Sequence, residues 1–238
     1  MVVLNTQYNL MYPRLSDIRR RIVAYEDALK GEFLQYQILP IPDDAPPEIP
    51  RVTITTKHGH SMLQLSLSGA VFQTAYDDAY NKSWEKCHDY LEKRMEQIYD
   101  IVKHISPERI YTQGITAQII VNIPDTNPVE FLTKGVPIID KNQDIWDFGC
   151  YATVISQNKY FATVQISNAR IAHIPLSAEN YEHKNYLLFN IEANDRKMFN
   201  QDSNNDSGKE TTKDLLSLMK EIVTVRIDAF ISGGVFKL

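Results

Sequence analysis

Two histidines, His58 and His60, are separated by a single glycine, a spacing that can bring two imidazoles to one metal ion. In an extended strand, residues i and i+2 point to the same face, so both imidazole rings could bind the same metal ion. Gly59 predicts a turn, however, and side-chain directions in a turn are not fixed in this way. The pair is therefore either a metal or catalytic site, completed by acidic partners, or two exposed turn histidines.

A second group of polar residues lies on two predicted strands. Tyr111 and Gln113 lie near the start of a strand over 109–123, and Glu192 and Asn194 lie at the end of a strand over 186–193. Glu192 and Asn194 are two residues apart and share one face of their strand. Because functional residues are often found where a rigid strand ends, these four side chains are the predicted ligand-binding residues.

The common catalytic fingerprints are absent from the sequence. It contains no Gly-x-Gly-x-x-Gly, no Gly-x-x-x-x-Gly-Lys-Ser/Thr and no Gly-x-Ser-x-Gly. It also lacks His-Glu-x-x-His and paired Cys-x-x-Cys, and Cys87 and Cys150 are its two cysteines. The sequence therefore predicts no cofactor and favours a non-enzymatic protein over an enzyme.

Aromatic residues gather on and before the longest predicted helix: Tyr76, Tyr80, Trp84, Tyr90 and Tyr99. Such residues suit either a core or a protein interface, and Tyr76, Tyr80 and Trp84 are the predicted interface residues. Stacking on nucleic-acid bases would require surrounding Lys and Arg. The net charge is −5, so nucleic acid is not an expected partner.

The composition is that of a globular protein, with 43% hydrophobic and 23% charged residues. The N-terminus lacks a basic segment followed by a long apolar run, so no signal peptide is predicted. No stretch approaches the roughly 18 apolar residues of a membrane span. With few cysteines as well, a cytoplasmic protein without membrane contact is expected.

Three helices are predicted from apolar residues at intervals of three or four. The first starts at Ser16, and its stripe is Leu15, Ile18, Ile22, Tyr25 and Leu29. The strongest stripe is Trp84, Cys87, Leu91, Met95, Ile98, Val102 and Ile105. A final helix is expected to start at Thr211, where Thr211-x-x-Asp214 resembles a capping box. Its predicted buried stripe is Leu215, Leu218, Ile222, Val225 and Ala229.

Alternating or β-branched segments predict the strands, with short connections typical of hairpins. The predicted strands are 2–8, 33–39, 51–57, 62–72, 109–123, 145–156, 160–171 and 186–193. The fold class is therefore α+β, an antiparallel sheet with long amphipathic helices packed on one face. Two strand-then-helix modules, 1–125 and 126–238, are expected, either as separate units or within one compact domain.

The order of several short segments resembles a known family. The segments are Pro46-Pro47-Glu48-Ile49-Pro50-Arg51, Leu63-Gln64-Leu65-Ser66, Tyr80-x-x-x-Trp84-Glu85, Tyr111-Thr112-Gln113-Gly114-Ile115 and Asn190-Ile191-Glu192-Ala193-Asn194. They are similar to those of a sporadically distributed bacterial family of conserved hypothetical proteins. The similarity is clearest over 33–125 and looser over 185–232, and Tyr111-Thr112-Gln113 stands where the family has Arg-Tyr-Asn.

The resemblance implies a cytoplasmic protein of the kind carried by mobile or defence-associated loci, and it supplies no catalytic residues. The first hypothesis is accordingly a non-enzymatic interaction protein, defence- or toxin–antitoxin-associated. It would self-associate or hold a protein partner through a strand edge or an aromatic helix face. The second is a nucleotide or metabolite sensor with a cavity lined from 111–121 and 151–155. The third is a metal-dependent hydrolase using His58 and His60.

Overall fold

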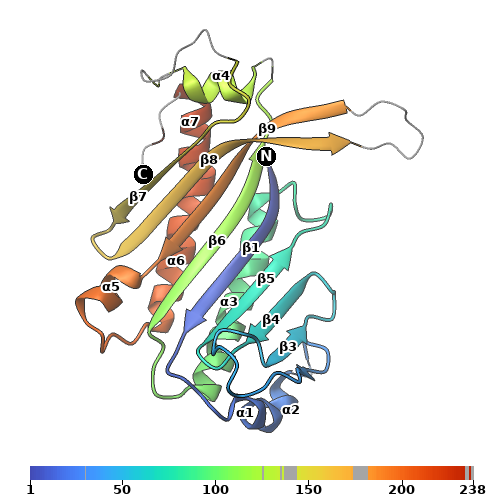
Figure 1. Ribbon diagram of the computed structural model, residues 1–238, viewed down its shortest axis with the longest axis vertical. Helices are drawn as coiled ribbons and strands as arrows, with labels where there is room; N and C mark the ends of the chain where they lie inside the picture. The colour runs from blue at the N-terminus through green and yellow to red at the C-terminus, as the bar shows by residue number, and fades with distance from the viewer. Residues whose placement is uncertain are drawn as a thin grey trace.

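The computed structural model describes residues 1–29, 31–124, 126–134, 136, 144–173, 182–233 and 236. It has a mixed α+β fold built on one large antiparallel sheet, in the strand order β2-β3-β4-β5-β1-β6-β9-β8-β7 (Figure 1). The strands are β1 (Val2–Met11), β2 (Gln37–Ile38), β3 (Val52–Thr55), β4 (Ser61–Leu65), β5 (Gly69–Ala75), β6 (Thr112–Val121), β7 (Gly149–Ser156), β8 (Tyr160–His173) and β9 (Glu182–Asn194).

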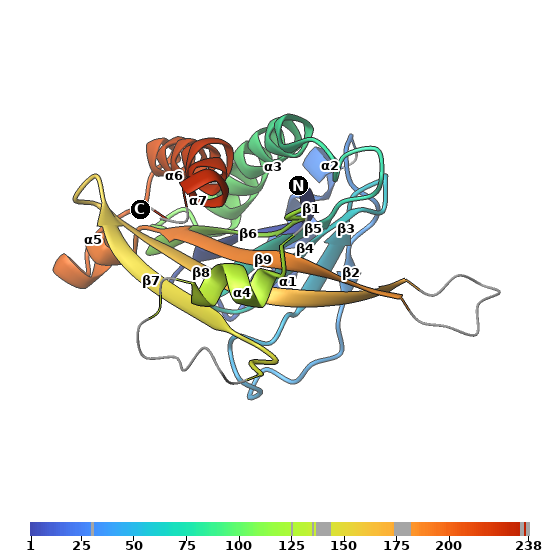
Figure 2. The same cartoon turned by 90° about the horizontal axis from the view of Figure 1, so that it is seen from above.

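The longer helices cover one face of this sheet. The helices are α1 (Ile18–Ala24), α2 (Glu26–Leu29), α3 (Trp84–Ile105), α4 (Pro128–Thr133), α5 (Arg196–Gln201), α6 (Lys209–Glu221) and α7 (Ile227–Gly233), with a π-helical turn at Ile222–Arg226. Viewed from above, α3, α6 and α7 lie side by side on the same side of the strands (Figure 2). The opposite side of the central strands carries no helix among the described residues.

The two faces of the sheet differ because side chains alternate along each strand. On β1, Tyr8 and Leu10 are buried beneath the helices, whereas Gln7 and Asn9 point the other way and are partly exposed. The core therefore lies between the sheet and α3, α6 and α7. The opposite surface is called the open face below.

One sheet contains strands from both of the predicted modules, 1–125 and 126–238. β6 precedes residue 125, and it pairs with β1 on one side and with β9 on the other. The division into 1–125 and 126–238 stays a prediction.

The strand predicted over 62–72 is wrong, because the chain turns between β4 and β5. The hydroxyl of Ser66 accepts hydrogen bonds from the backbone N–H groups of Ser68 and Gly69, at 3.3 and 3.0 Å. A Cβ at Gly69 would lie 2.9 Å from the carbonyl oxygen of Leu10, so this turn requires glycine where it packs against β1. The strand predicted over 33–39 is also too long, since the strand β2 is only Gln37–Ile38, with an isolated bridge between Phe33 and Thr56.

The last helix starts earlier than predicted, and its capping box does not form. α6 begins at Lys209 with Gly208 at its N-cap. Asp214 instead accepts a hydrogen bond from the Tyr160 hydroxyl on β8, at 2.6 Å. Asp214 therefore binds Tyr160, which is distant in the sequence, and not the backbone of Thr211 as a capping box would require.

The buried stripe of this helix is correct as far as Ile222 and wrong beyond it. The π-helical turn contains one more residue than an α-helical turn, which rotates the following side chains by about 100°. Ile227 and Phe230 are consequently buried, whereas Val225 is 58% exposed and Ala229 is exposed.

Candidate functional site

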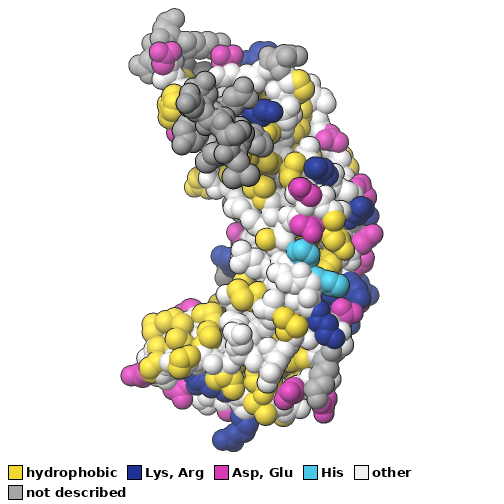
Figure 3. Space-filling model, turned by 90° about the vertical axis from the view of Figure 1, so that its right-hand side faces the viewer, with side chains coloured by type: hydrophobic (Ala, Val, Ile, Leu, Met, Phe, Trp, Pro, Cys, Tyr) yellow, Lys and Arg dark blue, Asp and Glu magenta, His cyan; other side chains and the backbone are white. Residues whose placement is uncertain are grey.

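The open face of the sheet is concave and lined mainly by uncharged polar side chains. Figure 3 shows the molecule from the side, hollowed between its two ends on the face opposite the helices. The larger of two hollows on this face has a volume of about 500 Å³ and crosses β5, β1, β6, β9 and β8, while a hollow of about 1010 Å³ lies elsewhere, beside α4. We call its polar lining the amide face: Asn5, Gln7, Gln73, Thr116, Gln118, Thr163, Gln165, Asn190 and Glu192.

The strand register aligns four amides in a row across the amide face. Asn5 lies opposite Gln118, Gln118 opposite Asn190, and Asn190 opposite Gln165. Tyr151 on β7 continues the row beside Gln165. Directly opposed side chains on an antiparallel sheet are about 5 Å apart at Cβ, so one ligand can contact several of these amides at once.

The hydrogen bonds within this row leave acceptors unused. The Nδ2 of Asn5 donates to the Oε1 of Gln118 at 2.6 Å. The Oδ1 of Asn190 is buried and has no hydrogen-bond partner within the described structure. A buried acceptor without a donor costs free energy.

Glu192 is the one charged side chain among the described residues that line the larger hollow. Its Oε1 accepts hydrogen bonds from Asn194 Nδ2 at 2.8 Å and from Arg196 Nη2 at 3.0 Å. The Arg196 guanidinium therefore neutralises the carboxylate. Glu192 and Asn194 also line a second hollow of about 380 Å³ toward Pro50, so these two predicted ligand-binding residues do lie together.

Gln113 lies on the opposite side of β6 and is 1% exposed. Its Oε1 accepts hydrogen bonds from the hydroxyls of Tyr8 and of Thr212, the latter at 2.6 Å. Its Nε2 donates to the carbonyl oxygens of Ser207 and Gly208, at 3.0 and 2.9 Å. Every hydrogen-bonding atom of this side chain is therefore used to hold α6 and the preceding loop against the sheet.

Asp195 completes this internal network, which we call the buried polar cluster (Tyr8, Gln113, Asp195, Ser207 and Thr212). Its Oδ1 accepts the backbone N–H of Gln113 at 2.7 Å, and its Oδ2 accepts the hydroxyl of Ser207. Burial raises the pKa of the Asp195 carboxyl group above its ordinary value of 3.8. The cluster stabilises the fold and does not reach the open face.

Tyr111, the remaining predicted ligand-binding residue, lies apart from both hollows. Its ring centroid is 5.3 Å from that of Phe199 and 4.7 Å from the guanidinium carbon of Arg109. Of the four predicted residues, Gln113, Glu192 and Asn194 thus line the second hollow, although Gln113 is only 1% exposed, and Tyr111 does not line it.

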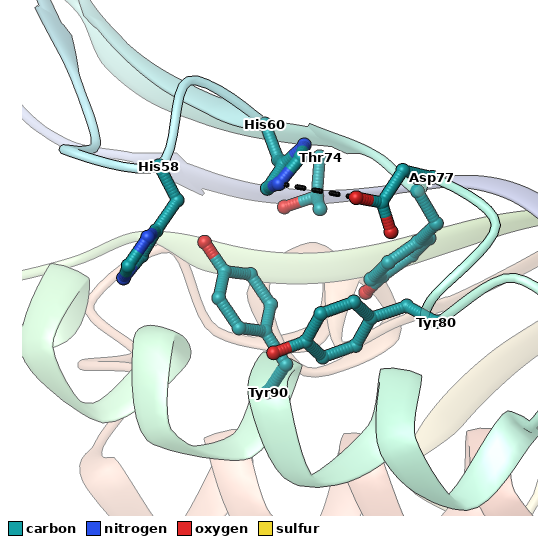
Figure 4. A pocket seen from close by; sticks show the side chains of 7 residues that line it. His58, His60, Thr74, Asp77, Tyr80 and Tyr90 are labelled. Atoms are coloured by element: carbon teal, nitrogen blue, oxygen red, sulfur yellow. Dashed lines mark ion pairs between the residues drawn. The ribbon is translucent and has the colours of Figure 1, made fainter.

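The two predicted metal-binding histidines line a separate small cavity of about 100 Å³ (Figure 4). His60 Nε2 lies 3.4 Å from Asp77 Oδ2, while His58 lies on the other side of the Tyr90 hydroxyl. Within the described ranges, the one group of three side chains close enough for a shared metal ion is His88, Asp89 and Glu92 on α3. The structure therefore does not join His58 and His60 in a metal site.

Tyrosine rings form the floor of this small cavity. Tyr76, Tyr80 and Tyr90 lie with ring centroids 5.9 to 6.4 Å apart, in tilted or edge-on contact. Tyr76 and Tyr80 are half-buried, whereas Trp84 is 1% exposed. Of the three predicted interface residues, Trp84 therefore lies in the core beneath α3 and is not accessible to a partner.

Sequence reasoning did not identify the amide face, although its signal is present in the strands. Polar and apolar residues alternate through the segments Thr116–Gln118, Thr163–Gln165 and Asn190–Glu192. Amides on the exposed side of a strand are ordinary in isolation. Their alignment becomes visible only when the pairing of β1, β6, β9 and β8 is known.

No protein-family model matches the chain, and no curated protein matches it significantly. The resemblance to a bacterial conserved hypothetical family therefore stays a prediction. In the part of the chain that the structure describes, no helix has the length and apolar character needed to cross a membrane.

Proposed function

We propose that this protein is a non-enzymatic binding protein and that its ligand lies on the amide face. The observation that carries the proposal is the aligned row Asn5, Gln118, Asn190 and Gln165 in a hollow of about 500 Å³. Directly opposed side chains on an antiparallel sheet are about 5 Å apart at Cβ, so one ligand can form hydrogen bonds with several of these side chains at once.

The chemistry of the amide face favours an uncharged ligand rich in hydroxyl groups, for which a neutral oligosaccharide is the best match. Side-chain amides donate and accept hydrogen bonds, as sugar hydroxyls do, and neither group carries a charge that would need desolvation. The larger hollow has no Lys or Arg among its lining residues. Phosphate-bearing ligands, including nucleic acids, would require such cations.

The volumes of the cavities separate the other hypotheses. Binding sites for metabolites usually enclose about 300–1,000 Å³, so the cavity of about 100 Å³ beside His58 and His60 is too small for a nucleotide. The hollows on the open face, at about 380 and 500 Å³, lie within that range. A protein partner, a defence-associated role and a cytoplasmic location remain proposals from the sequence and its resemblance.

The proposal is tested by isothermal titration of the full chain with neutral homo-oligomers of glucose, mannose and N-acetylglucosamine. We expect saturable binding of at least one class. The double variant Gln118→Ala/Asn190→Ala removes two hydrogen-bonding groups worth about 1 kcal/mol each, so the Kd should rise about tenfold or more.

Gln201→Ala is the matched control, because Gln201 is an exposed amide on α5, outside both hollows. It should leave the Kd unchanged. The oligosaccharide proposal fails if folded protein binds none of the three classes. The site assignment fails if binding occurs and the double variant binds as tightly as the control.

A further inference from the structure

Within the described part of the chain, the outer edge of β7 is an unprotected strand edge. β7 ends the sheet, so its outer backbone groups have no partner strand among the described residues. Its sequence, Gly-Cys-Tyr-Ala-Thr-Val-Ile-Ser, contains no charged residue and no proline. Natural sheets usually guard an exposed edge with Lys, Pro or a bulge, and none of these devices is present along Gly149–Ser156.

Exposed apolar side chains accompany this edge. Tyr151 is 78% exposed and Ile155 is 54% exposed, and both point to the open face with Thr153 between them. Thr153 lies opposite Thr163 on β8, and their hydroxyls are 2.8 Å apart. β7 therefore has both backbone groups without a partner strand on its outer edge and apolar side chains that are exposed to water in the monomer.

The other edge of the sheet is protected. β2 is only two residues long, Gln37–Ile38, and the chain leaves it through Pro40 and Pro42. Proline cannot donate a backbone hydrogen bond, and so short a strand offers little to pair with. Edge pairing is thus available at one end of the sheet and not at the other.

We propose that β7 pairs with β7 of a second copy of this chain, which makes a two-fold symmetric dimer with one continuous sheet. Strands related by a two-fold axis perpendicular to the sheet run antiparallel, and their open faces lie on the same side. The strand is uncharged, so like charges do not oppose each other across the axis. Because β2 is protected, the assembly closes at two copies and does not extend into a filament.

The side chains select the register of this pairing. An axis at Thr153 places that residue opposite its own copy and Tyr151 opposite Ile155 of the second copy. Aromatic and β-branched residues form favourable cross-strand pairs, so this register covers the two most exposed apolar side chains of the strand with each other. The dimer then joins two amide faces side by side, although the pairing does not depend on what they bind.

The oligomeric state is tested by sedimentation equilibrium of the full chain across a range of concentrations. We expect a mass of twice 27.4 kDa for the wild-type protein. Thr153→Lys opposes two ammonium groups at the axis and should shift the protein to monomer. Thr163→Lys is the matched control, because it places the same charge on the same face one strand further in, and it should remain dimeric.

A cross-linking experiment tests the register. In a Cys150→Ser background, Thr153→Cys should form an intermolecular disulfide on mild oxidation, because paired residues lie within disulfide distance. Tyr151→Cys in the same background should not, since residue 151 faces residue 155. A wild-type monomer at every concentration overturns the proposal, as does a dimer that Thr153→Lys leaves intact. A disulfide at 151 and not at 153 overturns the register.

Discussion

The two faces of the sheet are built by the same strands and have opposite characters. On β9, Leu187, Phe189 and Ile191 are fully or almost fully buried beneath the helices. The intervening residues Asn190 and Glu192 line the open face. An alternation of period two therefore separates the residues of the core from those of the open face within a single strand.

The two faces use their polar side chains differently. On the covered face, the buried polar cluster satisfies its members internally, as Gln113 shows with partners for both of its amide atoms. On the open face, Gln7, Gln73 and Gln165 line a hollow. The same residue types thus stabilise the fold on one side and line an open surface on the other.

The largest expected effect is a difference in unfolding free energy between substitutions at two neighbouring residues, one on each face of the sheet. Phe189 is 0% exposed, with its ring centroid 6.0 Å from that of Phe230. Phe189→Ala should lower the free energy of unfolding by about 3–5 kcal/mol, because it leaves a cavity in the core. Leu188→Ala, on the open face, should cost about 1 kcal/mol. Urea denaturation measures both, and similar losses would contradict the assignment of faces.

A smaller effect distinguishes two glutamines on β6. Gln113→Ala leaves the buried hydroxyls of Tyr8 and Thr212 without their shared acceptor and should cost about 2–3 kcal/mol of unfolding free energy. Gln118→Ala removes an amide from the open face and should change stability by no more than about 0.5 kcal/mol. Chemical denaturation of the two variants provides the measurement. If Gln118→Ala proves the more destabilising, the amide face has a structural role that we have not assigned to it.

The smallest effect is a pH dependence from the buried polar cluster. Burial raises the pKa of Asp195 in the folded state above 3.8, so its contribution to stability is fully present below that pH. The contribution is lost as the pH rises through the raised pKa. Asp195→Asn does not titrate, so the stability of wild type relative to this variant should fall as the pH increases.

Unfolding free energies of both proteins between about pH 4 and pH 7 provide the comparison, since the slope reports the difference in bound protons. Subtracting one curve from the other removes the titration of the remaining carboxylates. A difference that is constant or that rises with pH would show that the folded state does not raise this pKa.

Local sequence patterns determined which segments are helices or strands and how polar and apolar residues alternate along each strand. Ser83 caps α3 by accepting the N–H of Lys86, and the helix then runs from Trp84 to Ile105, as its apolar spacing predicts. These features depend on interactions between residues close in the chain, which a sequence displays directly. The presence of strands near Gln113 and Asn190 was predictable for the same reason.

Only the tertiary structure decided which residues meet. Gln113 and Asn190 are both polar strand residues, and the sequence does not reveal that one faces α6 while the other faces the hollow. That outcome depends on which side of the sheet the helices cover and on the strand order, both of which are set by contacts between residues distant in the chain. The π-helical turn that moves burial from Val225 to Ile227 belongs with these features, because Phe230, which follows it, packs against Phe189 of β9.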